Sequence, residues 1–237
     1  MDIIIREDIG QYMKDLKQWL SETRDCSLEE MADFFSARID GYEDHMSLWK
    51  RAYQRFAGLI PENCTDILDL GCGTGLELDE IFKRFPDVSV TGIDLCRDML
   101  NRLKEKHQDK NLELVCADYF QYELGESCRD VILSFESLHH FRPEEKKRLY
   151  RKLNSALKDG GTFLLCDYIA CCEEEEELLF AVCREKREKF NIPQERFVHF
   201  DTPLTLDHEI RLLEAAGFSM VSAVDCIDGA TIIRAEK

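Results

Sequence analysis

From residue 66 onward, short apolar runs with strand character alternate with segments whose apolar side chains recur at helical spacing. This alternation is typical of βαβ units, in which right-handed crossovers place helices on both faces of a parallel sheet. The pattern predicts an α/β fold with a Rossmann-like, doubly wound and mostly parallel sheet. The expected strands are residues 66–72, 88–94, 112–118, 130–135 and 161–170, and the expected helices between them are residues 76–84, 97–107 and 143–158.

The chain has a different pattern before and after this alternation. Residues 1–60 have helical periodicity, so we expect an N-terminal helical cap in front of a domain over residues 61–237. In the cap, Ser27 is placed to cap the second helix, and a third helix is expected over residues 48–59. The tail is expected to form helices over residues 173–190 and 205–216, followed by an antiparallel hairpin of strands 218–225 and 229–236.

Composition excludes several classes of protein. The 31 Lys and Arg residues against 48 Asp and Glu residues give a formal net charge of −17, and such a surface repels the phosphate backbone of nucleic acids. No apolar run approaches the about 18 to 20 residues of a membrane-spanning helix. The 11 cysteines are scattered without a Cys-x-x-Cys pair. We therefore expect a cytoplasmic protein with reduced thiols, no metal site and no membrane partner.

A glycine-rich turn over residues 69–75 (DLGCGTG) follows the first expected strand. Ligands of open α/β sheets lie at the carboxyl ends of the strands, where glycines let the backbone approach a nucleotide-like group. The spacing is G-x-G-x-G with Leu76 next, which departs from the dinucleotide fingerprint G-x-G-x-x-G and disfavours an NAD-dependent dehydrogenase. The sequence contains no P-loop motif either. The turn predicts a site for another nucleotide-like ligand.

Acidic residues end the next two expected strands. Asp94 lies 25 positions after Asp69, and a carboxylate at the end of a second strand can accept hydrogen bonds from both ribose hydroxyls of an adenosine. Asp118 follows the third strand, where it can accept a hydrogen bond from an adenine amino group while Tyr119 borders the ring. Acidic residues also commonly cap helices. Three of them at three successive strand ends nevertheless indicate an adenosine site.

Together these motifs resemble those of the class I S-adenosylmethionine-dependent methyltransferases over residues 40–237. The segments that carry the resemblance are residues 69–75, 92–94 (GID), 116–119 (CADY), 135–141 (FESLHHF) and 157–162 (LKDGGT). It implies a seven-stranded sheet with a reversed last strand and S-adenosylmethionine as a cofactor that lies across the glycine-rich turn. The cofactor-binding residues that it implies are Tyr42, Asp69, Gly71, Cys72, Gly73, Gly75, Asp94, Leu95, Asp118, Tyr119 and Ser134.

Residues 38–46 (RIDGYEDHM) look like the segment that folds over the cofactor in many family members that act on small molecules. On this resemblance, Tyr42 would lie near the methionine part of the cofactor. A plain connector between two helices is the alternative. The acceptor is accordingly expected to be a small molecule, held by residues 1–60 and 171–204, but no pattern in these segments identifies it.

Candidate catalytic residues follow the fourth and fifth strands. Methyl transfer from a sulfonium is an in-line displacement, so the enzyme chiefly supplies alignment and exclusion of water. A general base is needed only when the acceptor must lose a proton. His139, with His140 beside it, is expected in that role because the carboxyl end of the fourth strand faces the donor and histidine titrates near neutrality. Tyr168 is a second candidate, and packing in the core is the alternative for each.

Two further functions stay open. Residues 177–180 (ELLF), Arg184, Lys189 and residues 194–196 (QER) are similar to the carboxy-S-adenosylmethionine synthases, methyltransferase relatives that build a modified cofactor for tRNA wobble-uridine modification. Arg196 matches the arginine that pairs with the added carboxylate in that family, a role suited to a guanidinium. A protein that binds S-adenosylmethionine without turnover is the other alternative. A homodimer and a link to tRNA also stay open.

Overall fold

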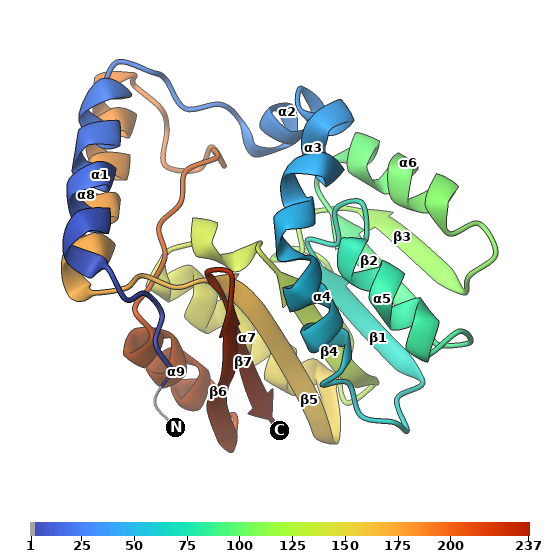
Figure 1. Cartoon of the computed structure of the whole chain (residues 1–237). Coiled ribbons are helices and arrows are strands. Elements are labelled where there is room, and N and C mark those ends of the chain that lie inside the picture. Colours follow the sequence, from blue (N-terminus) through green and yellow to red (C-terminus); the bar gives the residue numbers. More distant parts are fainter. Residues whose placement is uncertain (1–2) are drawn as a thin grey trace.

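The computed structural model describes residues 3–237 and is built on a seven-stranded sheet (Figure 1). The strand order is β3-β2-β1-β4-β5-β7-β6, and the neighbours pair in parallel except β7, which is antiparallel to both β5 and β6. The predicted fold class and reversed last strand are therefore confirmed. The strands are β1 (Asp66–Leu70), β2 (Ser89–Asp94), β3 (Leu112–Cys116), β4 (Arg129–Phe135), β5 (Leu157–Tyr168), β6 (Met220–Ile227) and β7 (Ala230–Glu236).

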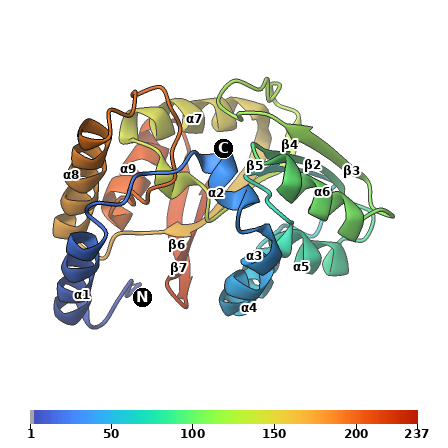
Figure 2. The same cartoon turned by 90° about the horizontal axis from the view of Figure 1, so that it is seen from above.

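Helices cover both faces of this sheet (Figure 2). Side chains alternate along each strand, so Val131 and Leu133 of β4 join one buried cluster and Ile132 joins the other. The first cluster includes residues of α4 (Lys50–Ala57), α5 (Leu76–Arg84) and α6 (Arg97–Lys106). The second includes residues of α7 (Pro143–Ala156) and α9 (Leu206–Ala215). Burial on both faces explains the consecutive apolar residues within the central strands, such as residues 131–133 of β4.

The helical N-terminal region divides into two separate parts. Helix α1 (Ile9–Glu22) runs beside α8 (Glu173–Lys189) at one side of the molecule (Figures 1 and 2). Leu20 and Leu179 bury their side chains in that contact. Helices α2 (Met31–Ser36) and α3 (Ile39–Met46), with the 3-10 turn Ser47–Trp49, lead instead to α4 over the sheet. Each amphipathic helix thus finds its own apolar partner, whereas the sequence predicted one cap.

Several predicted boundaries differ from the structure by a few residues, and three of the differences have a local reason. The second helix begins at Met31 after Glu30, not after Ser27, whose hydroxyl bonds to the neighbouring Leu28 carbonyl. The helix predicted over residues 48–59 is α4, and it begins at Lys50 because a 3-10 turn precedes it. Helix α7 ends at Ala156, since the chain pairs with β4 from Leu157 onward. Within residues 3–237, no helix is long and apolar enough to cross a bilayer.

Candidate functional site

The glycine-rich turn connects the end of β1 to the start of α5. Gly71 and Gly73 adopt positive φ angles of +73° and +48°, a conformation that side chains rarely tolerate. The N–H groups of Gly71 and Cys72 donate to the Ile93 carbonyl of β2 at 2.8 and 3.2 Å. A Cβ atom on Gly71 would stand 2.1 Å from Ser137 Oγ. The turn therefore brings bare backbone against both β2 and the loop after β4.

Asp94 ends β2 and holds the turn with its side chain. Its Oδ2 accepts a hydrogen bond from the Gly73 N–H at 2.9 Å, and its Oδ1 accepts one from the Cys96 N–H at 2.7 Å. Burial raises the pKa of the Asp94 carboxyl, and these backbone donors oppose that shift. Asp94, the residue predicted to bind ribose, therefore also holds the glycine-rich turn in place.

A narrow cleft of about 60 Å³ lies over the turn. It adjoins two larger cavities of about 670 and 660 Å³, and it shares lining residues with each of them. We call the first the arginine cavity, after residues 142, 148, 184, 187 and 196, and the second the histidine cavity, after residues 45, 139, 140 and 199. Six of the predicted cofactor-binding residues line the cleft: Tyr42, Gly71, Gly73, Asp94, Leu95 and Tyr119.

Tyr42 lies between the cleft and the histidine cavity and lines both. Its hydroxyl is 3.5 Å from the position that a Cβ on Gly73 would take, and its ring meets that of Phe35 edge-on at 5.9 Å. Burial raises the pKa of the Tyr42 phenol, so it stays neutral. Helix α3 therefore folds over the glycine-rich turn, at the place where the sequence predicted such a segment.

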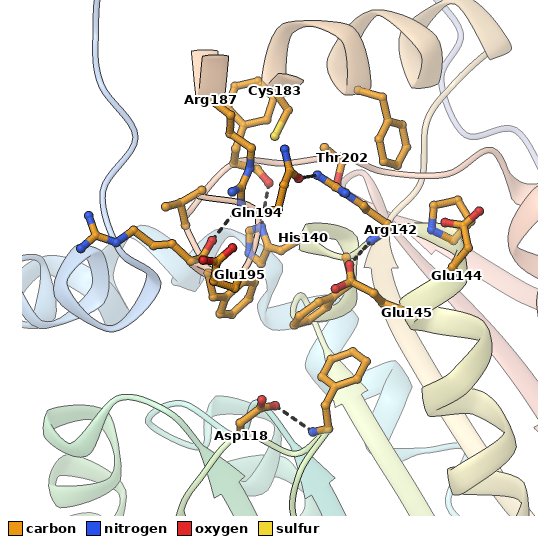
Figure 3. A pocket seen from close by; sticks show the side chains of 18 of the residues that line it. Asp118, His140, Arg142, Glu144, Glu145, Cys183, Arg187, Gln194, Glu195 and Thr202 are labelled. Carbon is orange, nitrogen blue, oxygen red and sulfur yellow. Dashed lines mark hydrogen bonds between the residues drawn. The ribbon is translucent and has the colours of Figure 1, made fainter. Parts of the chain in front are cut away.

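Asp118 lies in the arginine cavity, across from the arginines (Figure 3). Its Oδ1 accepts a hydrogen bond from the Phe120 N–H at 2.8 Å. On the other side, Arg142 donates to the Gln194 side chain, and Arg187 donates to the Pro193 carbonyl at 2.8 Å. Leu95 lines both this cavity and the cleft. The space beside Asp118, the predicted adenine-binding residue, therefore adjoins the space beside Asp94, the predicted ribose-binding residue.

Four predicted cofactor-binding residues line neither the cleft nor the two adjoining cavities. Asp69 and Cys72 are buried, and Gly75 is the N-cap residue of α5. Ser134 is fully buried and donates its hydroxyl to the Leu70 carbonyl at 3.1 Å. The side chains of Asp69, Cys72 and Ser134 are buried behind the turn, and Gly75 has no side chain. We therefore do not propose that these four residues contact the cofactor.

His139 is surrounded by carboxylates at the edge of the histidine cavity. Its Nδ1 lies 2.5 Å from Asp167 Oδ1 and 3.7 Å from Glu136 Oε2, and its Nε2 lies 3.5 Å from Asp201 Oδ1. Burial lowers the pKa of His139, but Asp167 and Asp201 outweigh it and raise the pKa well above its usual value. The predicted catalytic histidine is therefore held in one orientation beside the cavity.

Tyr168 takes part in a different network. Its hydroxyl donates to Glu175 on α8 and lies 2.7 Å from the Tyr12 hydroxyl on α1. Burial raises the pKa of the Tyr168 phenol, and its side chain lines neither the cleft nor the histidine cavity. The prediction that Tyr168 could serve as a base does not fit this arrangement, because its hydroxyl is directed towards the contact between α1 and α8.

Sequence reasoning missed two carboxylates of the histidine cluster. Asp167 lies near the end of β5, next to the end of β4, so the same strand-end argument that selected Asp94 would have found it. Asp201 lies in the segment between α8 and α9, which has no periodic pattern, and no sequence signal pointed to it. His199 of the same segment stacks on Phe34 of α2 with ring centroids 3.5 Å apart. The cavity thus joins parts of the chain that are distant in sequence.

Comparison with known proteins agrees with this architecture. Residues 67–161 match the family described as "Methyltransferase domain". The chain is 26% identical over 202 residues to the carboxy-S-adenosyl-L-methionine synthase of Nautilia profundicola, covering 81% of this chain and 84% of that protein. It is 32% identical over 137 residues to the malonyl-[acyl-carrier protein] O-methyltransferase 2 of Ilyobacter polytropus, covering 56% of this chain and 52% of that protein.

Solved structures have the same fold. The human N-acetylserotonin methyltransferase, solved in complex with S-adenosylmethionine, superposes with a TM-score of 0.61 at 19% identity, over 84% of this chain and 54% of that one. The sheet order, the glycine-rich turn and the matched family segment agree with each other. Residues 67–161 therefore match a methyltransferase domain, and the chain is similar to S-adenosylmethionine-dependent methyltransferases and carboxy-S-adenosyl-L-methionine synthases.

Proposed function

We propose that this protein transfers the methyl group of S-adenosylmethionine to a small molecule bound in the histidine cavity. The observation that carries the proposal is the continuity of this cavity with the cleft over the glycine-rich turn. Tyr42, Glu136 and His140 line both spaces. An acceptor in the cavity would therefore lie next to the cofactor, which is the alignment that an in-line methyl transfer requires.

Within the site, each cofactor-binding residue has a distinct proposed role. Asp94 would accept hydrogen bonds from the ribose hydroxyls, and Asp118 one from the adenine amino group. Gly71 and Gly73 would let the backbone approach the cofactor, because no side chain stands between. Tyr42 would close the methionine end of the cleft. These roles are supported by the lining of the cleft and of the arginine cavity.

The lining of the histidine cavity favours an acceptor with an aromatic or apolar body and a polar reacting group. Phe34, Phe35 and Trp49 supply apolar walls, whereas His139 and Asp201 are polar. Pockets of this mixed kind bury the body of a small molecule and orient it with a few polar contacts. We propose that His139, held by Asp167 and kept protonated by its raised pKa, promotes loss of the acceptor's proton to solvent by stabilising the anion that remains.

The test is native mass spectrometry of the purified protein during titration with S-adenosylmethionine, followed by assay of S-adenosylhomocysteine release with separate sets of phenols, alcohols, amines and carboxylic acids. We expect one cofactor per chain and release with at least one set. Absence of cofactor binding would refute the proposal. Tight binding without release from any set would instead favour a binding protein that does not turn over.

A carboxy-S-adenosylmethionine synthase is the second candidate function, and the similarity to the Nautilia profundicola enzyme over most of both chains favours it. Arg196 lines the arginine cavity, but its Nε lies 2.8 Å from Glu30 Oε1 and its side chain is 55% exposed. To bind a cofactor carboxylate, Arg196 would have to leave Glu30. A co-purified ligand heavier than S-adenosylmethionine by one carboxylate group would support this function.

A further inference from the structure

We propose that His139, His140 and Asp201 bind a divalent metal ion where the cofactor cleft meets the histidine cavity. One ring nitrogen of each histidine and one Asp201 oxygen lie within 4.8 Å of one another. The inference rests on the proposed function, because it states how the acceptor is activated and which class of acceptor fits. His139 would then act as a ligand of the ion instead of as a charged group beside the acceptor.

The distances between these atoms fit shared ligation better than direct hydrogen bonds. Asp201 Oδ1 lies 3.5 Å from His139 Nε2 and 3.3 Å from His140 Nδ1, and the same His140 nitrogen lies 3.3 Å from the Phe200 carbonyl oxygen. A charge-assisted N–H···O bond to a carboxylate is shorter, about 2.7 to 2.9 Å. Two ligand atoms that each lie about 2.1 Å from a tetrahedral ion are separated by about 3.4 Å. The two separations from Asp201 match this value, and an ion at this position would take the place of the Phe200 carbonyl as the partner of His140 Nδ1.

Asp167 supports this arrangement from behind His139. It is completely buried, and its Oδ1 lies 2.5 Å from His139 Nδ1. In metal sites, a ligating histidine commonly donates its other ring N–H to a carboxylate, which fixes the tautomer and raises the basicity of the ligating nitrogen. A metal ion would displace the Nε2 proton of His139, and the remaining proton on Nδ1 would stay with Asp167. A second possible set, Glu136, His139 and Asp167, would require the nitrogen that Asp167 already occupies.

The Asp201 oxygen itself adds a second feature. Its Oδ1, which lies 3.3 to 3.5 Å from the two histidines, is shielded from solvent and forms no hydrogen bond within residues 3–237, an unfavourable state for a carboxylate oxygen. A metal ion would satisfy this oxygen. The Asp201 side chain as a whole is 43% exposed, and it lines the histidine cavity. Three protein ligands with the remaining positions open to a cavity are typical of catalytic metal sites.

The ligand types narrow both the metal and the acceptor. Two imidazoles and one carboxylate suit Zn²⁺, Fe²⁺ or Co²⁺ better than Mg²⁺ or Ca²⁺, which prefer oxygen ligands. An ion of this kind lowers the pKa of a hydroxyl group that binds it. The acceptor would therefore offer an oxygen, as a phenol or alcohol does, and lose its proton to solvent before the methyl group is transferred.

The experiment is a calorimetric titration of the full chain with Co²⁺ alone, recorded together with absorption spectra because the protein has 11 cysteines. Thiolate-bound Co²⁺ absorbs strongly in the near ultraviolet, whereas Co²⁺ bound by nitrogen and oxygen does not. We expect one Co²⁺ per chain without thiolate absorption. Asp201→Asn and His140→Gln should each weaken binding more than tenfold, and Asp167→Asn should weaken it about 10- to 100-fold.

His45→Gln is the matched control, because His45 lines the same cavity but lies outside the proposed ligand set. It should leave Co²⁺ affinity unchanged. Absence of Co²⁺ binding, thiolate absorption, or equal affinity in Asp201→Asn and wild type would overturn the metal site. Titration of the wild type and of each variant with S-adenosylmethionine checks folding and separates the two proposals. Cofactor binding without metal binding would refute only the metal site. A wild-type protein that does not bind the cofactor would refute the proposed function.

Discussion

Replacing Asp94 with alanine tests the cofactor site most directly. The side chain would lose its hydrogen bonds to the ribose hydroxyls, and a hydrogen bond to a charged group contributes about 1.5 to 3 kcal/mol. Because each 1.4 kcal/mol corresponds to about a tenfold change in affinity, we expect the Kd for S-adenosylmethionine to rise about 10- to 150-fold. Asparagine should not restore binding, since its NH₂ group would face one of the two backbone N–H donors that now point at the carboxylate.

The structure also predicts that the Asp94→Ala protein stays folded. The substitution leaves the N–H groups of Gly73 and Cys96 without their carboxylate acceptor. However, burial raises the pKa of Asp94, which means that the native state disfavours its charge. Removing the carboxylate relieves that penalty, and water in the cleft can reach the two freed donors. The two effects oppose each other, so we expect Tm to change by less than about 4 °C, or roughly 1 to 2 kcal/mol.

Isothermal titration with S-adenosylmethionine and a thermal melt of the same sample measure the two quantities. Asp87→Ala is the control, because Asp87 is an exposed carboxylate just before β2, and it should change neither value. Unchanged cofactor affinity in Asp94→Ala would refute the ribose assignment. Absence of a cooperative unfolding transition in Asp94→Ala would show instead that Asp94 is needed for the fold. That result would contradict the expected balance between the lost hydrogen bonds and the relieved burial of the charge.

Three other substitutions test the support around the site. Gly71→Ala should lower the free energy of unfolding by at least about 1 to 3 kcal/mol in a urea titration, because its φ of +73° strains any other residue; a neutral result would contradict the turn geometry. Lys146→Met should lower it by about 3 to 5 kcal/mol, since it leaves Glu209, 2.5 Å away, as an unpaired buried charge. Adding Glu209→Gln should recover most of that loss, and an unimproved double variant would refute the explanation. Burial raises the pKa of Glu77 well above its usual value, so the stability that comes from its protonated form is present below about pH 4.3 and is lost as pH rises. In urea titrations, the free energy of unfolding should therefore fall less between pH 5 and pH 8 for Glu77→Gln than for the wild type. An equal fall in both proteins would contradict the raised pKa.

The sheet could be predicted from the sequence because its strands are buried on both faces and so have simple patterns. Helix α5 (Leu76–Arg84) agrees with the predicted residues 76–84 at both ends. The beginning of α2 could not be predicted, because Ser27 is a good capping residue but the chain around it is extended towards α8. Likewise, the separation of α1 from α2 to α4 depends on which apolar surfaces are available, and that information lies in the tertiary packing rather than in the periodicity.

The cofactor site could be predicted further than the acceptor site for a physical reason. Gly71, Gly73 and Asp94 lie at the ends of adjacent strands, so order along the chain implies proximity in space. The sequence does not indicate side-chain direction, however. Asp69 and Ser134 have suitable positions in the strands, but alternation turns both into the packed sheet. No rule of strand order could bring Asp201 beside His139.

The proposed cofactor site and the histidine cavity are formed by different parts of the chain. The residues proposed to bind the cofactor are fixed by the register of β1 and β2, in which Asp69 pairs with Gly92, and a shift there would disturb the whole sheet. The histidine cavity is instead closed by α2, α3 and the segment that carries His199 and Asp201, none of which belongs to the sheet. Apart from Tyr42 of α3, substitutions in these parts should alter the proposed acceptor site while the proposed cofactor site stays intact. The His139 and Asp167 pair lies between the two regions, because His139 follows β4 and Asp167 lies in β5, so we expect changes at this pair to affect both.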